Sequence, residues 1–255
     1  MELRDKVAIV TGGASGLGGA TVRRFSAQGA KVAIFDLNEE LGSSLAGELG
    51  ENVIFCQVNV ADDDSIAAGI DRVMQAFEAI HICVNCAGRG GGATKTFGRK
   101  GRFPMTLFRD VININLIGTF SVLSQAAEKM SANEPDENGE RGVIINTASI
   151  AAYEGQKGQV AYAASKGGIV GITTPIARDL APYGIRIATI APGLCATPIL
   201  QGLSDEVKAG LEKDIPFPSR MAKPSEFAML AEHIVVNPYI NSETIRLDAG
   251  LRMKY

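Results

Sequence analysis

Histidine and cysteine, the side chains that most often bind zinc, are scarce in this sequence. The chain of 255 residues has two histidines, His81 and His233, and four cysteines. Cys83 and Cys86 form a C-x-x-C pair, but no second pair of ligands stands at the spacing of a zinc site. We therefore expect no metal site and four reduced cysteines, as is usual in a reducing compartment.

An excess of positive charge is also missing, because the formal net charge at pH 7 is −3. This balance disfavours a protein whose main partner is nucleic acid. No apolar run reaches the length of a membrane span. The opening residues MELRDKVAIVTGG enter a strand pattern at once and leave no room for a signal or transit peptide. We therefore expect a cytoplasmic protein without a membrane partner.

Short runs rich in Val and Ile alternate with amphipathic segments along the whole chain. The runs are apolar almost throughout, as expected for parallel strands that are buried on both faces of a sheet. Regular alternation with helices indicates βαβ units. We predict an α/β fold with one domain over residues 1–255: a Rossmann-type doubly wound parallel sheet of about seven strands, with helices on both faces. The predicted strands are 6–11, 31–36, 52–60, 81–88, 142–149, 185–193 and 243–250.

A glycine-rich stretch, TGGASGLG, lies between the first predicted strand and the first predicted helix. Its Gly12, Gly16 and Gly18 follow the spacing G-x-x-x-G-x-G. Glycine permits a tight turn and lets the backbone approach a pyrophosphate at the start of a helix. Because turns also favour glycine, the position after a strand and before a helix is what makes this stretch a predicted dinucleotide site.

Asp36 ends the second predicted strand, 18 residues after Gly18. A carboxylate there can accept hydrogen bonds from the hydroxyls of the adenosine ribose and would repel a 2′-phosphate. No Arg or Lys stands at positions 13–15 or 37–38 to bind such a phosphate. We therefore predict NAD as the cofactor; the alternative is that Asp36 is a solvated strand end.

Tyr162 and Lys166 stand four residues apart in the stretch QVAYAASKGGIVG, so a helix would place them on one face. A phenol with a pKa of ~10 is a poor base at neutral pH, and a nearby ammonium group favours the phenolate. The pair therefore predicts a tyrosine that acts as general acid or base. By themselves the two residues could equally be an amphipathic surface pair.

Three glycines follow this pair, Gly167, Gly168 and Gly171. Each glycine disfavours a helix by about 1 kcal/mol relative to alanine. Such a cost is usually offset by another interaction. We expect close packing of this helix against a neighbouring helix or against its copy in another subunit.

Further polar residues stand where a doubly wound fold binds its ligands. Ser149 ends the predicted strand VIINTAS, Asn115 lies in NINLIG within a predicted helix, and NCAG ends the fourth predicted strand. With the glycine loop and the Y-x-x-x-K pair, these motifs occur in the order typical of the short-chain dehydrogenase/reductase family. The sequence resembles this family over essentially all of its length. The resemblance implies a catalytic tetrad of Asn115, Ser149, Tyr162 and Lys166.

The resemblance also implies the role of each tetrad residue. Tyr162 exchanges the proton of the alcohol, and Ser149 hydrogen-bonds and orients the same oxygen. Lys166 lowers the pKa of the tyrosine and holds the nicotinamide ribose. Asn115 seats the lysine through a relay that includes water.

Two cofactor positions depart from the family pattern. Asn59 stands where the family commonly has Asp after the third strand, which puts adenine recognition by this side chain in doubt. Cys86 replaces the second Asn of the usual N-N-A-G and places a thiol near the adenosine. The NAD contacts implied by the resemblance are Gly12, Ser15, Gly16, Leu17, Gly18, Asp36, Asn59, Val60, Cys86, Ala87, Gly88, Tyr162, Lys166, Pro192, Gly193, Cys195 and Thr197.

The C-terminal stretches IAPGLCATPIL, IPFPSR and ETIRLDAGLRMKY resemble one branch of the family, the type 2 3-hydroxyacyl-CoA dehydrogenases. These are tetrameric enzymes of fatty acid β-oxidation that oxidise the 3-hydroxyl of short acyl-CoA esters with NAD. The resemblance implies substrate contacts from Ser149, Gln159 and Tyr162, and a substrate lid at about 197–218. An NAD-dependent hydroxysteroid or other secondary-alcohol dehydrogenase is the alternative within the family. A catalytically silent NAD-binding scaffold subunit is the alternative outside enzymes.

The loop 89–103 is basic and contains no acidic residue. It follows the fourth predicted strand, so its cations could attract the phosphates of coenzyme A. A solvated, flexible loop is an equally good interpretation. Its Phe97 and Phe103 could cover the substrate pocket or anchor the loop. The basic residues are Arg89, Lys95, Arg99, Lys100 and Arg102.

Overall fold

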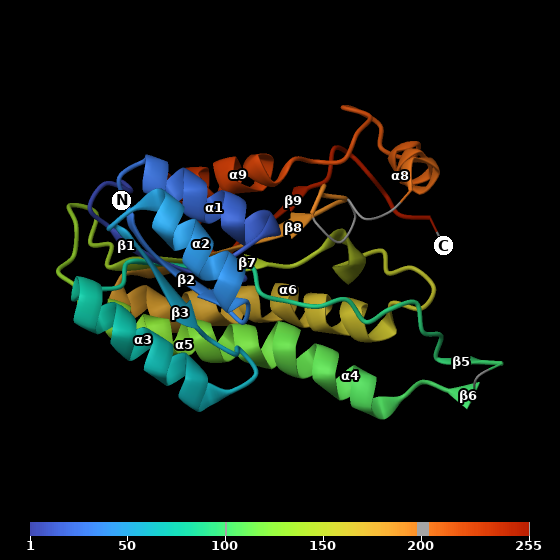
Figure 1. Cartoon of the computed structure of the whole chain (residues 1–255), viewed down its shortest axis with the longest axis horizontal. Helices are drawn as coiled ribbons and strands as arrows, with labels where there is room; N and C mark the ends of the chain where they lie inside the picture. Colours follow the sequence, from blue (N-terminus) through green and yellow to red (C-terminus); the bar gives the residue numbers. More distant parts are fainter. Residues whose placement is uncertain (100, 198–203, 255) are drawn as a thin grey trace.

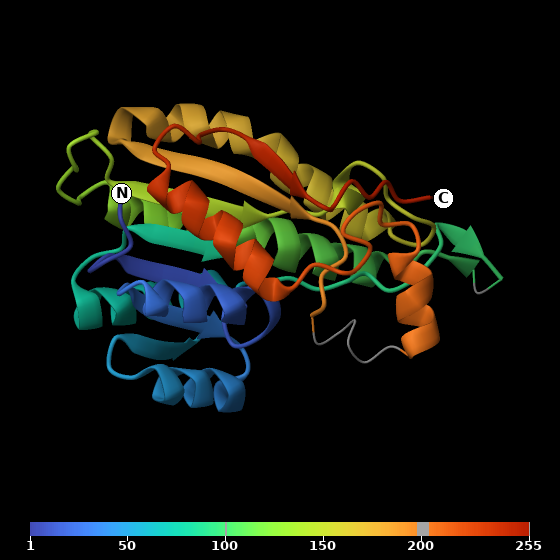
Figure 2. The same cartoon turned by 90° about the horizontal axis from the view of Figure 1, so that it is seen from above.

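The computed structural model describes residues 1–99, 101–197 and 204–254. Its main sheet has seven parallel strands in the order β3-β2-β1-β4-β7-β8-β9, which confirms the predicted doubly wound fold (Figure 2). The strand order reverses between β1 and β4, where two halves of the sheet diverge. The strands are β1 (Val7–Thr11), β2 (Lys31–Asp36), β3 (Val53–Gln57), β4 (Ile82–Asn85), β7 (Gly142–Thr147), β8 (Ile185–Pro192) and β9 (Thr244–Leu247).

Helices cover both faces of the sheet, as Figure 1 shows. One face carries α1 (Gly16–Ala27), α2 (Glu39–Leu49) and α9 (Pro224–Val236), and the other carries α3 (Asp63–Phe77), α5 (Gly118–Met130) and α6 (Val160–Leu180). Val10, Phe25 and Phe227 are fully buried in the first layer, whereas Ile9 and Ile66 are fully buried in the second. Side chains of successive strand residues therefore enter opposite cores, which explains why the strand sequences are continuously apolar.

Several elements were not distinguished in the sequence. α4 (Met105–Ile112) runs into a π-helical turn at Asn113–Ile117 and then into α5. Part of the basic loop forms a small antiparallel hairpin, β5 (Phe97–Gly98) and β6 (Gly101–Arg102), which projects beyond the carboxyl ends of the main strands (Figure 2). Short 3-10 turns occupy Ile150–Ala152 and Ala181–Tyr183, and α8 spans Asp205–Glu212.

The two aromatic residues of the basic loop behave differently. Phe103 is only 7% exposed and packs edge-to-face on Phe108, with ring centroids 6.2 Å apart. Phe97 is 77% exposed on the hairpin. Phe103 therefore anchors the loop, whereas Phe97 is free to contact a ligand or another molecule.

Close packing explains one of the three glycines of α6. A Cβ atom at Gly168 would lie 2.6 Å from Cδ2 of Leu116, in the π-helical turn. A Cβ atom at Gly167 would meet its nearest neighbour at 3.9 Å, and one at Gly171 would meet no described atom within 4 Å. The predicted helix contact thus exists within the chain at Gly168.

Across the described ranges, no helix combines the length and apolarity needed to cross a membrane.

Candidate active site

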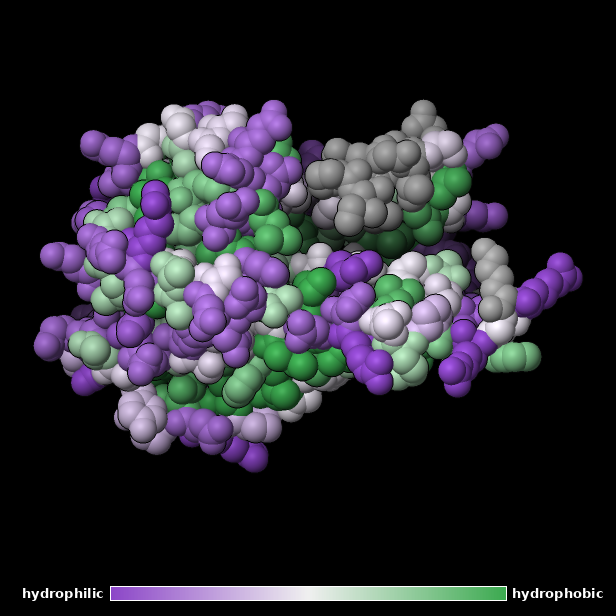
Figure 3. Space-filling model, turned by 60° about the horizontal axis from the view of Figure 1, so that its bottom comes forward, coloured by the Kyte–Doolittle hydropathy of each residue, from purple (hydrophilic) through white to green (hydrophobic). Residues whose placement is uncertain are grey.

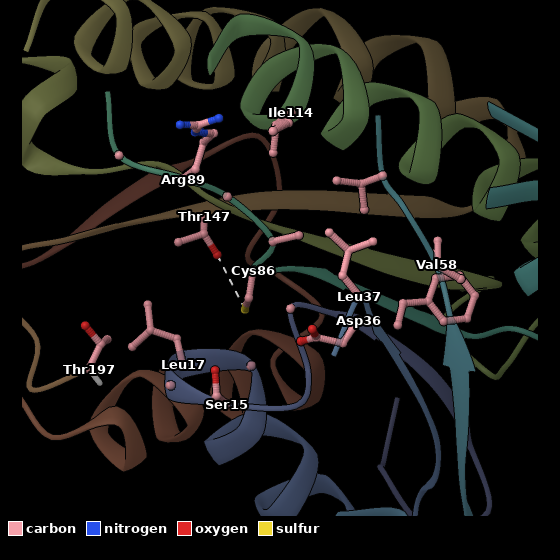
Figure 4. Close-up of a pocket in the computed structure, with 18 of the residues that line it drawn as sticks. Ser15, Leu17, Asp36, Leu37, Val58, Cys86, Arg89, Ile114, Thr147 and Thr197 are labelled. Carbon is pink, nitrogen blue, oxygen red and sulfur yellow. Dashed lines mark hydrogen bonds between the residues drawn. The ribbon is translucent and has the colours of Figure 1, made fainter. Parts of the chain in front are cut away.

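The carboxyl ends of β1, β2 and β4 open onto a cleft of about 700 Å³, which we call the larger cleft. Figure 4 shows Ser15 and Leu17 reaching it from the start of α1, Asp36 and Leu37 from the end of β2, and Cys86 and Thr147 from the middle of the sheet. The predicted NAD contacts that line this cleft are Gly12, Ser15, Gly16, Leu17, Gly18, Asp36, Asn59, Val60, Cys86, Ala87, Gly88, Tyr162, Lys166 and Thr197.

The glycines of the loop let it pack tightly against itself and against the segment after β4. Gly12 has a φ of +62°, and a Cβ atom there would lie 2.9 Å from the backbone nitrogen of Ala87. A Cβ atom at Gly18 would lie 2.2 Å from the carbonyl oxygen of Gly12. α1 begins at Gly16, and its N-cap Ser15 makes no side-chain capping bond. The start of α1 thus offers N–H groups and the positive helix end, which fits the pyrophosphate of a dinucleotide.

Asp36 holds the loops on both sides of its strand end. Its Oδ2 accepts a hydrogen bond of 3.0 Å from the backbone N–H of Ala14, and its Oδ1 accepts one of 3.0 Å from Asn38. Each carboxylate oxygen keeps a further lone pair for a ribose hydroxyl. The next residue, Leu37, is 63% exposed and brings no positive charge to the cleft.

Asn59 and Cys86, the two departures from the family pattern, both line the larger cleft. Oδ1 of Asn59 accepts a hydrogen bond of 3.0 Å from the backbone N–H of Ala61, so this side chain stabilises its own turn. Cys86 Sγ accepts a hydrogen bond of 3.6 Å from the Thr147 hydroxyl (Figure 4). The thiol therefore packs against the sheet end.

A smaller pocket of about 290 Å³ adjoins the larger cleft. Ser149, Gln159 and Tyr162, the three predicted substrate contacts, all line it. Pro192, Gly193 and Cys195, predicted as NAD contacts, lie here instead of in the larger cleft, because the end of β8 borders the smaller pocket. Both spaces share Leu17, Thr147, Tyr162 and Thr197. Tyr162 thus stands where the two spaces meet.

The first turns of α6 carry Tyr162 and Lys166 on one face, as their spacing predicts. Lys166 is only 5% exposed, and its Nζ lies 5.7 Å from the centre of the Tyr162 ring. The same Nζ donates a hydrogen bond of 2.7 Å to the carbonyl oxygen of Thr147 at the end of β7. The sheet edge therefore fixes the ammonium group beside the phenol.

Burial shifts the pKa values of both groups. It raises the pKa of the Tyr162 phenol, and a hydrogen bond with Ser149 opposes this rise. It also lowers the pKa of Lys166 to about 8. The net direction for the Tyr162 phenol is therefore upward, because loss of hydration outweighs the hydrogen bond with Ser149. Lys166 still carries its charge at neutral pH.

Asn115 is fully buried in the π-helical turn, behind the two spaces. Its Oδ1 accepts a hydrogen bond of 2.8 Å from the Arg89 N–H, and its Nδ2 donates to the Arg89 carbonyl and the Ser165 hydroxyl at 3.0 Å each. Within the described residues it makes no direct bond to Lys166. The Asn115 side chain thus fixes the loop after β4, next to Gly88 and the lysine.

Sequence reasoning missed several lining residues. Arg89 and Thr147 border the larger cleft, and their nearness to NCAG and to Ser149 in the sequence could have indicated this. Met253, near the C-terminus, also lines the smaller pocket, and no motif around it in the sequence indicates a pocket residue. Of the predicted lid, residues 198–203 lie outside the described ranges, and α8 follows them.

The C-x-x-C pair is split between two environments. Cys83 is buried in the core under α3 and α5, whereas Cys86 faces the larger cleft. Burial raises the pKa of both thiols to about 12 and that of Cys56 and Cys195 to about 11. In the described part of the chain, no group of three or more His, Cys, Asp or Glu residues could hold a metal ion.

Known proteins resemble this chain along almost its whole length. The family described as short chain dehydrogenase matches residues 6–208. The 3-hydroxyacyl-CoA dehydrogenase type-2 of Rattus norvegicus is 51% identical over 99% of this chain and 97% of its own length, and that of Mus musculus is 52% identical over the same shares. A crystal structure of 3-hydroxyacyl-CoA dehydrogenase type-2 from Mycobacterium avium superposes with a TM-score of 0.95, at 45% identity, over 98% of this chain and 96% of that one.

Proposed function

The chain belongs to the short-chain dehydrogenase family, and we propose on this premise that it interconverts short-chain 3-hydroxyacyl-CoA and 3-ketoacyl-CoA esters with NAD. The observation that carries the proposal is the position of Tyr162, which borders both the larger cleft and the smaller pocket. A phenol there can reach a carbonyl or alcohol oxygen in the pocket while the reacting carbon faces the cleft. The relatives named for this activity support the choice of substrate class.

In this mechanism Tyr162 moves the proton. It takes the proton of the alcohol in the oxidative direction and returns it to the oxygen in the reductive direction. Ser149 donates a hydrogen bond to the same oxygen and orients it. When bound, the nicotinamide ring supplies the hydride acceptor or donor and, in its oxidised form, a positive charge that favours the phenolate.

Lys166 and Asn115 prepare the site for this transfer. The charge of Lys166 stabilises the phenolate as the proton leaves, and its three donors leave hydrogen bonds for a ribose hydroxyl beside the bond to Thr147. Asn115 keeps the loop after β4 in place through Arg89 and Ser165, so the backbone at Gly88 stays clear of a bound dinucleotide.

Asp36 supports NAD over NADP as the cofactor. A 2′-phosphate on the adenosine ribose would approach a carboxylate that already accepts two backbone hydrogen bonds, and Leu37 beside it offers no compensating charge. The electrostatic cost falls on NADP alone.

The size of the smaller pocket supports a short acyl chain. A space of about 290 Å³ lined by Ile150, Leu194 and Met253 can hold a few carbons of an acyl group but not coenzyme A itself. The coenzyme would then extend past the basic hairpin, where Arg99 and Arg102 are exposed. We assign its phosphates to this hairpin.

Exposed apolar side chains support self-association, and we propose a homotetramer. Ile117 and Phe120 are 52% and 49% exposed on the side that carries α4 and α5, where Figure 3 shows a band of apolar residues. Burial of such a band against a second copy would remove it from water. Sedimentation equilibrium should give a mass of four chains.

We also propose that the enzyme acts in fatty acid β-oxidation and that it is cytoplasmic.

The function is tested with acetoacetyl-CoA and NADH. The wild type should consume NADH, and Tyr162→Phe should lose at least about a thousandfold in kcat while it still binds NADH, because only the proton transfer is removed. A wild type that binds NADH and reduces no carbonyl compound in a broad panel would instead be a scaffold subunit. Activity on steroid ketones but on no acyl-CoA would instead identify the protein as a hydroxysteroid dehydrogenase of the same family.

The hairpin contact is tested separately. Arg99→Ala with Arg102→Ala should raise KM for acetoacetyl-CoA by about tenfold and leave a CoA-free 3-keto ester unchanged. An equal loss on both substrates would remove the phosphate contact from the proposal.

A further inference from the structure

The segment after β9 turns back toward the smaller pocket. Asp248 starts the turn: its carbonyl oxygen accepts a hydrogen bond of 2.9 Å from the Leu251 N–H. Ala249 and Gly250 have φ values of +51° and +79°, which are needed for this reversal. The chain then brings Met253 to the pocket wall that also contains Ser149 and Tyr162. We call residues 249–254 the C-terminal tail.

A cluster of charged groups ties this tail to the segment after Ser149. Arg246 of β9 binds Glu154 with both terminal nitrogens, at 2.8 and 3.1 Å, and its Nε binds Asp248 Oδ2 at 2.6 Å. The same guanidinium donates a hydrogen bond of 3.1 Å to the Leu251 carbonyl. Glu154 in turn accepts a hydrogen bond of 3.2 Å from the backbone N–H of Met253. Leu251 and Met253 of the tail thus contact the two partners of one ion pair.

This ion pair differs from an ordinary surface pair. The side chains of Glu154 and Arg246 are 23% and 22% exposed, and Asp248 is 7% exposed. A bidentate, partly buried pair within a network is stronger and better oriented than an isolated exposed pair. The Arg246 guanidinium holds the pKa of the Glu154 carboxyl below its usual range. The Glu154 carboxyl is therefore charged throughout the neutral pH range.

Apolar packing joins the same parts of the chain. Leu251 of the tail is 3% exposed and packs in one cluster with Ile150, just after Ser149, and Ile215, just after α8. Leu194 and Met253 complete the edge of this cluster. The tail therefore packs against Ile150, which lines the smaller pocket, and against Ile215, which lies within the predicted lid segment.

We infer that Glu154 and Arg246 are positioning residues that hold the C-terminal tail in place, and that Met253, held in this way, limits the length of the acyl chain. The inference rests on the proposed function. Replacing the Met253 side chain by a methyl group would lengthen the apolar pocket by about three heavy atoms. One methylene in such a pocket changes discrimination by about 10–200-fold.

The kinetic test compares acetoacetyl-CoA with 3-ketooctanoyl-CoA. In Met253→Ala, the ratio of kcat/KM for the long over the short substrate should rise about tenfold. Glu154→Gln, which changes no atom of the pocket, should raise the ratio in the same direction by at least about threefold. In the double variant the two effects should not add, because both act through the position of Met253.

The matched control is Glu48→Gln, which removes the charge and the bidentate geometry from the exposed pair of Glu48 on α2 with Arg23 on α1. It should leave the chain-length ratio unchanged. Equal losses on both substrates in Met253→Ala and Glu154→Gln would overturn the inference, since a merely structural role lowers all activity together. Arg246→Lys keeps the charge but loses the bidentate geometry, and it should show a smaller shift of the same sign.

Hydrogen exchange separates this inference from the proposed function. In Glu154→Gln, the amide of Met253 should exchange at least about tenfold faster than in the wild type and in Glu48→Gln, because the Glu154 acceptor is weakened. Unchanged exchange would overturn the anchoring role even in an active enzyme. A wild type that is inactive on every acyl-CoA would overturn the role of Met253 together with the proposed function, and exchange alone would then decide the anchoring role.

Discussion

Asp36 brings a negative charge to the point where a dinucleotide would place its adenosine ribose. Asp36→Asn keeps an oxygen that can accept the Ala14 N–H but removes the charge. We predict that the Kd ratio of NADPH to NADH, measured by fluorescence titration, falls at least tenfold in this variant. Glu39→Gln, on α2 outside the larger cleft, is the control and should not change the ratio. An unaltered ratio in Asp36→Asn would contradict the selectivity assigned to this carboxylate.

Lys166 loses its proton within the range of an ordinary assay, because burial lowers its pKa to about 8. Below pH 8 the lysine is charged and supports the phenolate of Tyr162; above pH 8 it becomes neutral and that support is lost. We predict that kcat/KM for ketone reduction falls about tenfold per pH unit above pH 8. Lys166→Arg should move this fall to higher pH, and a wild-type profile that stays flat to pH 10 would contradict the assignment.

The position of Tyr162 and Lys166 on one face of α6 was predictable from sequence, whereas the electrostatics around them were not. The spacing of Tyr162 and Lys166 already places both on one helix face. The direction of the tyrosine pKa depends on how deeply the phenol is buried, and no spacing records that depth. The contacts of Asn115 with Arg89 and Ser165 likewise depend on a π-helical turn, which has no periodic signature of its own.

Helix α6 contains two glycines whose surroundings differ, Gly168 and Gly171. Gly168→Ala forces a methyl group to 2.6 Å from Leu116, so we predict a loss of about 1–3 kcal/mol in the free energy of unfolding. Gly171→Ala meets no described atom within 4 Å and should stabilise the chain by up to about 1 kcal/mol. Urea denaturation of the two variants measures both effects. Destabilisation by Gly171→Ala would mean that a second copy of the chain covers this position.

At the level of elements, the hydrophobic pattern predicted the strands of the main sheet, but it could not predict which distant segments contact one another. All seven main strands were predicted within a few residues, because most of them are apolar on both faces; β9, which contains Thr244 and Arg246, is the exception. The β5–β6 hairpin consists of two-residue strands, too short for alternation to appear. The C-terminal tail reaches the pocket through Arg246 and Glu154, which are 92 positions apart in the sequence.

For the whole molecule, His81 is one group that makes stability depend on mild acid. It lies just before β4, and its Nδ1 accepts a hydrogen bond of 3.2 Å from the Val7 N–H of β1. Burial lowers the pKa of His81 to about 4, whereas an unfolded histidine has a pKa near 6.5. The unfolded chain thus binds a proton first, so the contribution of His81 is complete above pH 6.5 and is lost as pH falls toward 4.

We predict that His81→Gln, whose side-chain oxygen can still accept the Val7 N–H, flattens the dependence of unfolding free energy on pH between 6.5 and 4. Denaturant titrations at several pH values measure this slope. The exposed His233→Gln is the control and should retain the wild-type slope. Parallel curves for wild type and His81→Gln would contradict the role given to the buried imidazole.

The raised pKa values of the four thiols have a consequence for chemical durability. Alkylating agents and peroxide attack the thiolate, and at pH 7 a thiol with a pKa near 11 or 12 supplies almost none. Cys56, Cys83 and Cys195 are also buried. The native protein should therefore tolerate oxidants that inactivate many cysteine-containing enzymes. Chemical modification of Cys56 and Cys83 would require the sheet to open, so the rate of modification would report the rate of opening.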